Sequence, residues 1–194
     1  MIIGISGKLG TGKSYYSQFI KEYIQQHYPN ESIIEIAFAD QIKINTIVKH
    51  NVPRNDVYIT KTHASRHLLQ IEGTEKGRLV HGPDIWIKYI QEWIYLLQQR
   101  GFKHFLISDV RFDNEAQFIK SQPHNLLVRL EAPVRNKQRL DLEYTPEQQE
   151  TIKNHASECN LDCYNDFDKV LLNNTPEQSK YNTEYLTNLL QSLF

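Results

Sequence analysis

The chain has 194 residues, of which 22 are Lys or Arg and 23 are Asp or Glu, so its formal net charge is -1. This length fits one domain, and the near-neutral balance argues against a nucleic acid polymer as the main ligand. With 40% apolar and 23% charged residues, the composition excludes a chain that is disordered throughout.

A membrane span and a disulfide framework are not expected either. No run approaches the roughly 18 apolar residues that a membrane span needs, and the apolar start lacks a basic leader. The two cysteines, Cys159 and Cys163, are too few for a disulfide scaffold and suit a reducing compartment. The sequence therefore predicts a soluble cytoplasmic protein, located in the host cytoplasm if its origin is viral.

The first part of the chain is predicted to form a strand, a glycine loop and a helix. Residues 1–6 are a short apolar run rich in Ile, which predicts a buried strand. Apolar residues then recur at helical spacing over 13–28. The β-branched and aromatic segment 32–39 predicts a second strand, and a short helix is expected over 41–50.

The segment 62–100 is predicted to be mainly helical. Pro83 stands at a helix start, and an apolar stripe that includes Trp86 runs from there toward Gly101. This stripe is interpreted as core, so Trp86 is not assigned to a binding pocket.

Strands and helices continue to alternate in the second half of the chain. The predicted strands there are residues 102–108, 125–130 and 169–172. Asp113 is expected to cap the helix after the third strand, and the last amphipathic helix starts near Thr175. The polar segment 131–168 has weak periodicity, which predicts a mobile insertion. Strands that alternate with helices imply a parallel sheet covered on both faces.

The loop between the first strand and the first helix carries the most specific motif. Residues 7–14 read GKLGTGKS, which matches G-x-x-x-x-G-K-[ST] in full. Glycines let backbone N–H groups surround a triphosphate, and the helix N-terminus adds partial positive charge. Lys13 is expected to neutralise the β- and γ-phosphates, and the Ser14 hydroxyl to bind Mg²⁺. The predicted ATP-binding residues of this segment are Gly7, Gly10, Thr11, Gly12, Lys13, Ser14 and Tyr15.

Other parts of the sequence favour a kinase over other nucleotide-binding classes. A GTPase switch should carry an N-K-x-D base reader, but segment 136–139 reads NKQR and lacks the aspartate. A motor ATPase would carry an acidic pair after an apolar strand, whereas the third predicted strand is followed by Asp109, Val110 and Arg111. A single carboxylate beside a guanidinium predicts a metal-ordering or substrate-facing Asp109 next to a phosphate-binding Arg111.

A second phosphate-bearing substrate is expected from residues at strand ends and in the helical segment. The predicted substrate-binding residues are Asp40, Lys43, Arg66, Arg78, Asp109 and Arg111. The carboxyl ends of strands in an open α/β sheet meet at one crevice, and the arginine fork binds two phosphate oxygens. A solvated surface charge is the competing interpretation of each basic residue alone, and it is weakest for Arg111 because of its position.

Two further arginines are predicted to be catalytic. Arg135 and Arg139 lie at i and i+4 inside the polar insertion, on one face of a helix. A lid that closes over the phosphates and delivers positive charge to the transferring group needs this arrangement. An exposed basic helix, shared with Lys137, is the alternative interpretation.

Metal sites based on His and Cys are the weaker hypotheses. His155, Cys159 and Cys163 stand four apart, but no fourth ligand has suitable spacing, so structural cysteines are favoured over zinc. His63 and His67 lack the Glu of H-E-x-x-H and are interpreted as surface or packed histidines.

Several segments together resemble the phage-type deoxynucleoside monophosphate kinases, a branch of the P-loop kinases. Besides the phosphate loop, these are 37–43 (AFADQIK), 71–78 (IEGTEKGR), 83–90 (PDIWIKYI), 107–116 (ISDVRFDNEA) and 155–174 (HASECNLDCYNDFDKVLLNN). They cover most of the chain in the right order. The pieces D-V-R-F-x-N-E and S-E-x-x-L-D are much more specific to this family than the loop motif, which indicates only a P-loop.

The resemblance implies a fold and an activity. The fold is a single P-loop NTPase domain of the nucleoside monophosphate kinase type, with a five-stranded parallel sheet in the order 2-3-1-4-5. A helical acceptor-binding insert spans about 41–100 and a lid about 132–165. The activity is transfer of the γ-phosphoryl group of ATP to a deoxynucleoside monophosphate, giving ADP and the diphosphate, with Mg²⁺ as cofactor.

The resemblance also extends to site residues. Lys13 and Ser14 carry over from the shared loop. The acceptor-site residues that carry over are Lys43, Arg78, Asp109 and Arg111, while the flanks of Arg66 match less well. Asp109 joins Ser14 as an expected Mg²⁺ ligand. Asn173 follows the fifth strand, where such kinases usually pass the adenine.

Three matters stay open at the level of sequence. The animal-type phosphomevalonate kinases share the S-E-x-x-L-D tail and a kindred D-x-R element, but their loop lacks the full G-K-[ST] form, and a second Arg commonly stands where this chain has Phe112. A small-metabolite kinase of the same fold, or a nucleotide-binding regulatory protein that hydrolyses slowly, is therefore the alternative function. The accepted bases and the oligomeric state are not determined, with a homodimer as one option.

Overall fold

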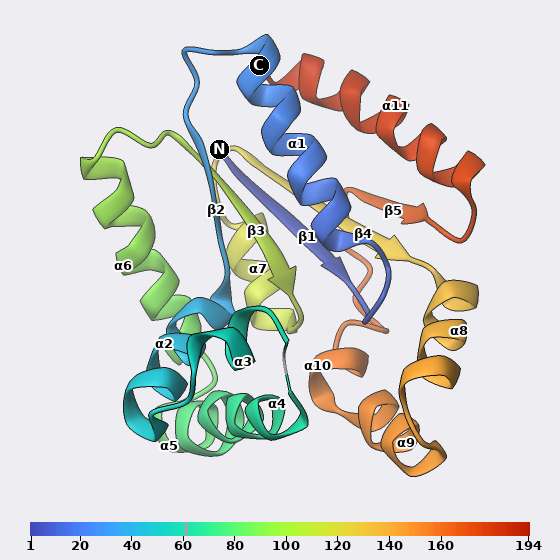
Figure 1. Ribbon diagram of the computed structural model, residues 1–194. Helices are drawn as coiled ribbons and strands as arrows, with labels where there is room; N and C mark the ends of the chain where they lie inside the picture. Colours follow the sequence, from blue (N-terminus) through green and yellow to red (C-terminus); the bar gives the residue numbers. More distant parts are fainter. Residues whose placement is uncertain (61) are drawn as a thin grey trace. The chain divides into compact units, whose positions relative to one another are not determined.

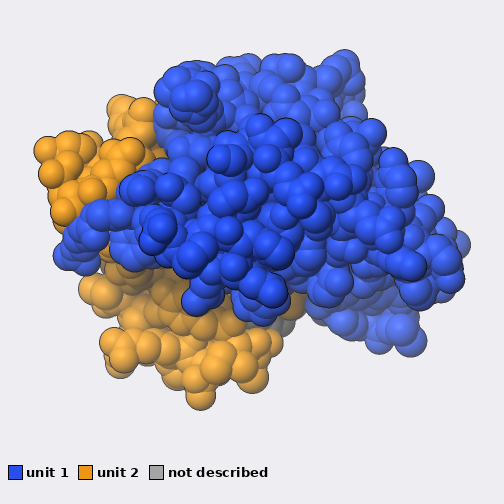
Figure 2. Space-filling model, turned by 90° about the horizontal axis from the view of Figure 1, so that it is seen from above, with its two compact units in different colours: residues 1–35, 100–194 blue, residues 36–99 orange. Residues whose placement is uncertain are grey.

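The structure is a computed structural model that describes residues 1–60 and 62–194, with the side chain of His63 lying outside the described part. The chain forms two compact units, one of residues 1–35 and 100–194 and the other of residues 36–99 (Figures 1 and 2). No helix in the part that the structure describes is long and apolar enough to cross a membrane.

One five-stranded parallel sheet organises the fold. Its order is β2 (Ile33–Ile36), β3 (His104–Val110), β1 (Ile2–Gly7), β4 (Asn125–Glu131) and β5 (Lys169–Leu172). All six residues of β1 are buried, as expected for the central strand of a parallel sheet with both faces covered. The predicted fold class, with the sheet order 2-3-1-4-5, is confirmed.

Helices cover both faces of this sheet (Figure 1). The helices α1 (Lys13–His27) and α11 (Pro176–Leu193) share a core with the β1 residues Ile3 and Ile5. The alternate residue Gly4 faces helix α7 (Asp113–Lys120), because a Cβ atom at Gly4 would lie 3.2 Å from Ile119. The period of two along β1 therefore assigns α1 and α7 to opposite faces.

The polar segment 131–168, which was expected to be a mobile insertion, contains three short helices that its hydrophobic pattern did not predict. It forms α8 (Pro133–Glu143), α9 (Pro146–Asn154) and α10 (Ala156–Cys159). Proline occupies the first turn of both α8 and α9, and the Thr145 hydroxyl accepts from the Gln148 N–H at the start of α9. These short helices begin with local caps and bury little apolar surface, which explains their weak hydrophobic periodicity.

The unit of residues 36–99 is helical. It contains α2 (Phe38–His50), α3 (Arg54–Tyr58), α4 (His63–Gln70), a π-helix η1 (Ile71–Arg78), α5 (Leu79–His81) and α6 (Ile85–Gln99). The helical prediction for 62–100 is confirmed, and Trp86 is buried as core. The predicted strand 32–39 is too long, because the Asp40 carboxylate accepts from the Ala37 N–H and starts α2 at Phe38.

Two smaller predictions near β3 need correction. Asp109 was expected to follow the third strand, but β3 continues to Val110. Its register against β1 slips between Gly4 and Ser6, so β3 carries a bulge at residues 108–109. Asp113 is the first residue of α7 and not its cap, since Glu115 accepts from the N–H groups of Arg111 and Phe112.

Candidate functional site: a phosphate-binding loop and its surroundings

The loop between β1 and α1 depends on glycine at two crowded positions. Gly7 has a φ of 146°, and a Cβ atom there would lie 2.6 Å from the Leu130 carbonyl oxygen. Gly12 has a φ of 97°, and a Cβ atom there would lie 2.6 Å from the Asn173 Nδ2 atom. Both positions are left-handed and closely packed, so any larger residue would be strained and would push the loop away from its neighbours.

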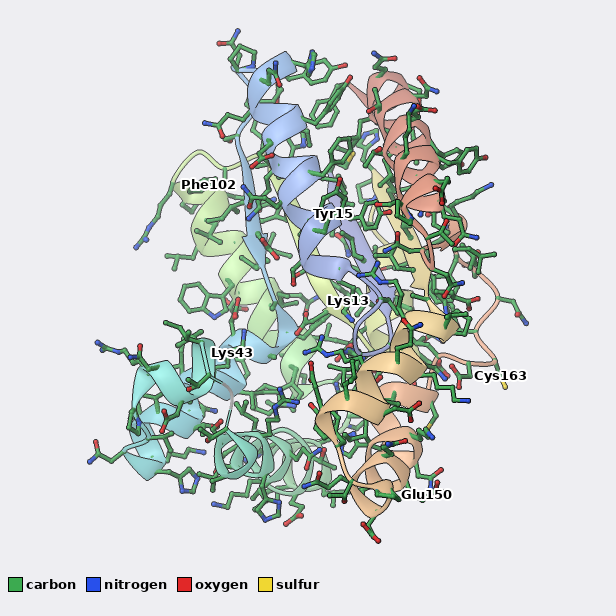
Figure 3. All side chains as sticks on the ribbon, turned by 45° about the vertical axis from the view of Figure 1, so that its right-hand side comes forward. Lys13, Tyr15, Lys43, Phe102, Glu150 and Cys163 are labelled. Atoms are coloured by element: carbon green, nitrogen blue, oxygen red, sulfur yellow. The ribbon has the colours of Figure 1, made fainter. Side chains whose placement is uncertain are left out.

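Lys13 folds back over the loop (Figure 3). Its Nζ atom donates to the carbonyl oxygens of Gly7 at 2.6 Å and Lys8 at 2.8 Å. Burial, and after it the positive charge of Arg111, lower the pKa of Lys13 to about 7 against the opposing effect of Glu158. Near neutral pH such an amine exists in both its charged and its neutral form, so binding of an anion beside it shifts it toward the protonated form.

The other predicted loop residues divide between scaffold and surface. Thr11 is buried, and its hydroxyl donates to the Lys8 carbonyl oxygen at 3.0 Å. Ser14 and Tyr15 are exposed in the first turn of α1, and the Tyr15 ring packs edge-on against Tyr16. Thr11 therefore shapes the loop, while the Ser14 hydroxyl is accessible to a ligand.

Asn173 joins the loop to the other end of the chain. Its amide donates to the Thr11 carbonyl oxygen at 2.9 Å, and its Oδ1 atom accepts from the Tyr16 hydroxyl at 3.0 Å. The Asn182 amide in turn donates to the same hydroxyl at 3.1 Å. The side chains of Tyr16, Asn173 and Asn182 are all buried. The Asn173 amide is thus engaged with the loop itself, and an adenine contact at this residue stays a prediction.

We expect Asn173→Ala to destabilise the fold by about 2 kcal/mol and to weaken nucleotide binding, because the Thr11 carbonyl would lose its buried partner. Urea unfolding and calorimetric titration with ATP measure the two effects. The exposed Asn154, whose side-chain amide donates to Glu150, is the matched control. An Asn173→Ala protein as stable as Asn154→Ala would contradict this account.

Helix α8 brings both predicted catalytic arginines to the loop. The Arg135 Nη1 atom donates to the Asn173 carbonyl oxygen at 3.2 Å. The side chain of Arg139 packs over Gly10, where a Cβ atom would lie 3.1 Å from Arg139 Cδ, and its Nε atom pairs with Glu143 at 3.0 Å. Asn136 donates to the Leu9 carbonyl oxygen and fixes the helix to the loop. Two guanidinium groups therefore flank the glycine turns.

The end of β3 supplies two charges next to Lys13. The bulge at 108–109 precedes Arg111, whose Nη1 atom lies 2.6 Å from Glu158 Oε1 and 3.4 Å from the Ser157 carbonyl oxygen. Asp109 and Arg111 both act on the pKa of Lys13, the carboxylate raising it and the guanidinium lowering it. The sequence prediction that both side chains lie near the phosphates therefore agrees with their closeness to Lys13, while their roles stay predictions.

Two acidic residues that were not among the predicted site residues also bind the loop. Glu158 Oε2 accepts from the Leu9 N–H at 2.8 Å, and Asp162 Oδ2 pairs with Lys8 Nζ at 2.7 Å. A shallow pocket beside the loop is lined by Gly7, Lys8, Arg111, Arg129, Glu158 and others. The spacing of Glu158 and Asp162, four residues apart in S-E-x-x-L-D, was the signal that could have assigned both to one surface.

The four predicted acceptor residues of the 36–99 unit hold local contacts. Asp40 caps α2 and pairs with Lys43 at 2.9 Å, and the Lys43 ammonium lies 5.5 Å from the centre of the Tyr58 ring. Arg78 donates to the Pro83 carbonyl oxygen at 2.7 Å. Arg66 lies half-buried on α4. These contacts fix Asp40 in a capping role and leave the substrate roles of all four untested.

The π-helix η1 carries a buried carboxylate, Glu72. Glu72 is 1% exposed and contacts Lys49 at 2.9 Å, His50 at 2.9 Å and Lys76 at 3.1 Å. Burial raises the pKa of Glu72, but the hydrogen bonds from His50, Lys49 and Lys76 outweigh it and lower the pKa to about 2. Glu72 is therefore ionised at neutral pH and links Lys49 and His50 of α2 to η1.

Ser14 and Asp109 are the predicted ligands of Mg²⁺. Ser14 and Asp109 provide hard oxygen atoms, which is the donor type that Mg²⁺ prefers, and Asp109 lies near enough to Lys13 to shift its pKa. Within residues 1–60 and 62–194, no group of three or more His, Cys, Asp or Glu side chains could hold a metal ion. Cys159 and Cys163 are free and exposed, and Figure 3 shows Cys163 pointing outward.

Comparison with known proteins places the fold. No protein-family model and no curated protein sequence matches the chain. Among solved structures, TT1252 from Thermus thermophilus is similar over 100% of this chain and 98% of its own, with 14% identity and a TM-score of 0.58. APE1195 is similar over 100% of this chain and 96% of its own, with 16% identity and a TM-score of 0.54. These likenesses show a shared fold.

A shikimate kinase from Aquifex aeolicus is also similar, over 99% of this chain and 98% of its own, with 15% identity and a TM-score of 0.46. The fold assignment does not depend on this weaker likeness. It rests on the sheet order, on the loop between β1 and α1 and on the two likenesses with higher TM-scores.

Proposed function

We propose that the protein is an ATP-dependent kinase that transfers the γ-phosphoryl group to a deoxynucleoside monophosphate. The observation that carries the proposal is the set of cationic groups around one glycine loop. Lys13 lies on the loop, Arg135 and Arg139 flank it, and Arg111 lies close enough to lower the pKa of Lys13. Phosphoryl transfer is catalysed mainly by such positioning and charge stabilisation.

In the proposed mechanism, this chain supplies positive charge and orientation. Lys13 turns from the Gly7 and Lys8 carbonyl groups to the β- and γ-phosphates, and the two arginines of α8 balance the charge that develops on the transferring group. Arg111 holds the acceptor phosphate in line. Mg²⁺, bound through Ser14 and Asp109, would add further charge neutralisation. The acceptor phosphate is already ionised, so no strong general base is needed.

For the acceptor, we retain Asp40, Lys43, Arg66 and Arg78 as proposed binding residues. All four belong to the 36–99 unit. The specific support for a deoxynucleoside monophosphate is the resemblance of segments 71–78 and 107–116 to the phage-type kinases. Segment 71–78 is a π-helix, and π-helical turns are frequent at functional sites, so its conformation also supports a functional role.

A coupled ADP-release assay tests the proposed function. The panel contains deoxynucleoside monophosphates, ribonucleoside monophosphates and phosphomevalonate, with a control that lacks an acceptor. Release of ADP that depends on a deoxynucleoside monophosphate supports the proposal. Release only with phosphomevalonate identifies a small-metabolite kinase of this fold, and slow release that no acceptor stimulates indicates a regulatory nucleotide-binding protein.

Arg111→Ala should raise the KM for the acceptor by at least roughly tenfold, because a bidentate phosphate contact is lost. Initial rates at varied acceptor concentration measure this effect. Arg100→Ala, which removes an exposed arginine at the end of α6, is the charge-matched control. An unchanged response to acceptor concentration would remove Arg111 from the proposed site.

A further inference from the structure

Glu158 occupies an unusual place for a carboxylate. Its Oε2 atom accepts from the Leu9 N–H of the phosphate loop at 2.8 Å, and its Oε1 atom accepts from Arg111 Nη1 at 2.6 Å. The side chain is only 13% exposed. It also acts on Lys13, whose pKa it raises. One anion therefore already lies among the amide, guanidinium and ammonium groups beside this loop.

These donors are the groups that a phosphate would use. Backbone N–H groups of a glycine-rich loop and the fork of an arginine both bind phosphate oxygens, and a carboxylate offers them the same kind of charged acceptor. A single N–H group directed at Glu158 is not available to a phosphate at the same time. The carboxylate and a phosphate are thus alternatives at Leu9 and Arg111.

The neighbouring acid, Asp162, is anchored differently. It pairs with Arg129 Nη2 at 2.9 Å, and the Arg129 side chain is 9% exposed and also contacts Glu131 and the Leu161 carbonyl oxygen. This buried guanidinium fixes the chain at Asp162. Glu158 lies one helical turn earlier, on the four-residue helix α10, and it accepts from Leu9 of the loop and from Arg111.

We propose that Glu158 is an internal competitor for phosphate: it binds Leu9 and Arg111 in the ligand-free protein and must withdraw before a phosphate group of the ligand can bind there. Asp162 stays bound to Arg129 and acts as the pivot. The proposal depends on the proposed function only in requiring that this site receives a phosphate. Glu158 then sets how much negative charge a ligand needs in order to bind, so that multiply charged phosphates displace it and weakly charged groups do not.

Glu158→Gln tests the competition, because glutamine keeps one oxygen acceptor for Leu9 but loses both the negative charge and the second acceptor that bind Arg111. The probe is inorganic tripolyphosphate, and its dissociation constant is measured by calorimetric titration. We expect at least fivefold tighter binding to Glu158→Gln than to the original protein. Glu22→Gln, which removes an exposed charge on α1, should stay within twofold. Equal or weaker binding to Glu158→Gln, or binding to neither protein, would overturn the proposal.

A second measurement keeps Glu158 intact. Cys159 is exposed and adjacent to Glu158, so an environment-sensitive fluorophore can be attached there in a Cys163→Ser background. Saturating tripolyphosphate should change its emission, and an unchanged signal on a protein that binds the anion would overturn the withdrawal of Glu158. Failure of the proposed function would look different: the anion effects would persist, but ADP release would not depend on any acceptor.

Discussion

Lys13→Ala should lower turnover roughly 10²- to 10³-fold, because it removes a preorganised charge at the position of the transferring phosphate. The fold should survive, since the Lys13 ammonium donates to the Gly7 and Lys8 carbonyl groups of its own loop. Acceptor-dependent ADP release and urea unfolding measure the two outcomes.

The same residue predicts a pH effect on ligand binding. The pKa of Lys13 is lowered from 10.5 to about 7, so the unfolded chain binds more protons than the folded chain between these two values. This group therefore makes the fold less stable near pH 7 than near pH 10. A polyphosphate raises the pKa again, so binding at about pH 8 should take up close to one proton. Calorimetry in buffers of different ionisation enthalpy measures this uptake.

Two controls separate Lys13 from general charge effects. At about pH 6 the amine is already protonated, so the uptake of a proton on binding should largely disappear. Lys21→Ala removes a lysine of α1 that pairs with Glu35 of β2, and this variant should keep normal turnover. Near-normal phosphoryl transfer by Lys13→Ala would count heavily against the kinase assignment.

Gly77→Ala should destabilise the 36–99 unit by about 3 kcal/mol, through overpacking of the π-helix against α6. A Cβ atom at Gly77 would lie 2.3 Å from Trp86 Cζ2 and 2.8 Å from the Glu72 carbonyl oxygen. The indole cannot move away cheaply, because its N–H donates to the Gly73 carbonyl oxygen at 2.8 Å. Urea unfolding followed by tryptophan fluorescence measures the loss.

Gly73→Ala is the matched control in the same π-helix. A Cβ atom at Gly73 would meet Ile42 Cδ1 at 3.2 Å, which is the end of a flexible side chain. We expect a change of about 1 kcal/mol or less for this variant. Equal free energies of unfolding for the two variants would contradict the idea that the close contact between Gly77 and Trp86 excludes a larger residue at position 77.

Local patterns were enough to find most of the sheet and the loop. The Ile-rich run before Gly7 and the motif that ends at Ser14 predicted β1, the loop and α1, since a short apolar run before a glycine turn has few other solutions. The order of the strands was implied by the resemblance to known kinases and not by periodicity. Hydrophobic patterns indicate which residues face the core, but not which strand lies next to which.

The pattern-based predictions failed where short-range polar contacts decide the structure. Helices α8 to α10 begin at prolines and capping residues and bury few apolar side chains, so hydrophobic periodicity could not reveal them. The segment of the π-helix η1 was correctly predicted to be helical, but its π form was not predicted; there Gly77 packs closely against Trp86 of α6. The bulge in β3 shifts Asp109 from the end of the strand into it, and its sequence carries no glycine signal.

The candidate site was found in part for the same reasons. Lys13, Arg135 and Arg139 were predicted from the loop motif and the i, i+4 spacing, and the structure brings all three to the glycine loop. Glu158 and Asp162 were not predicted, because the search was for cations that attract a phosphate, and only the fold brings these two acids to Leu9 and Lys8.

The buried link from Asn182 through Tyr16 and Asn173 to the Thr11 carbonyl has a consequence for how the protein matures. The Thr11 and Asn173 partners are 162 positions apart in the chain. During synthesis the glycine loop is made before these hydrogen-bond partners, which arrive only with β5 and α11. The loop therefore acquires its final shape only after the residue 162 positions further along the chain has been added.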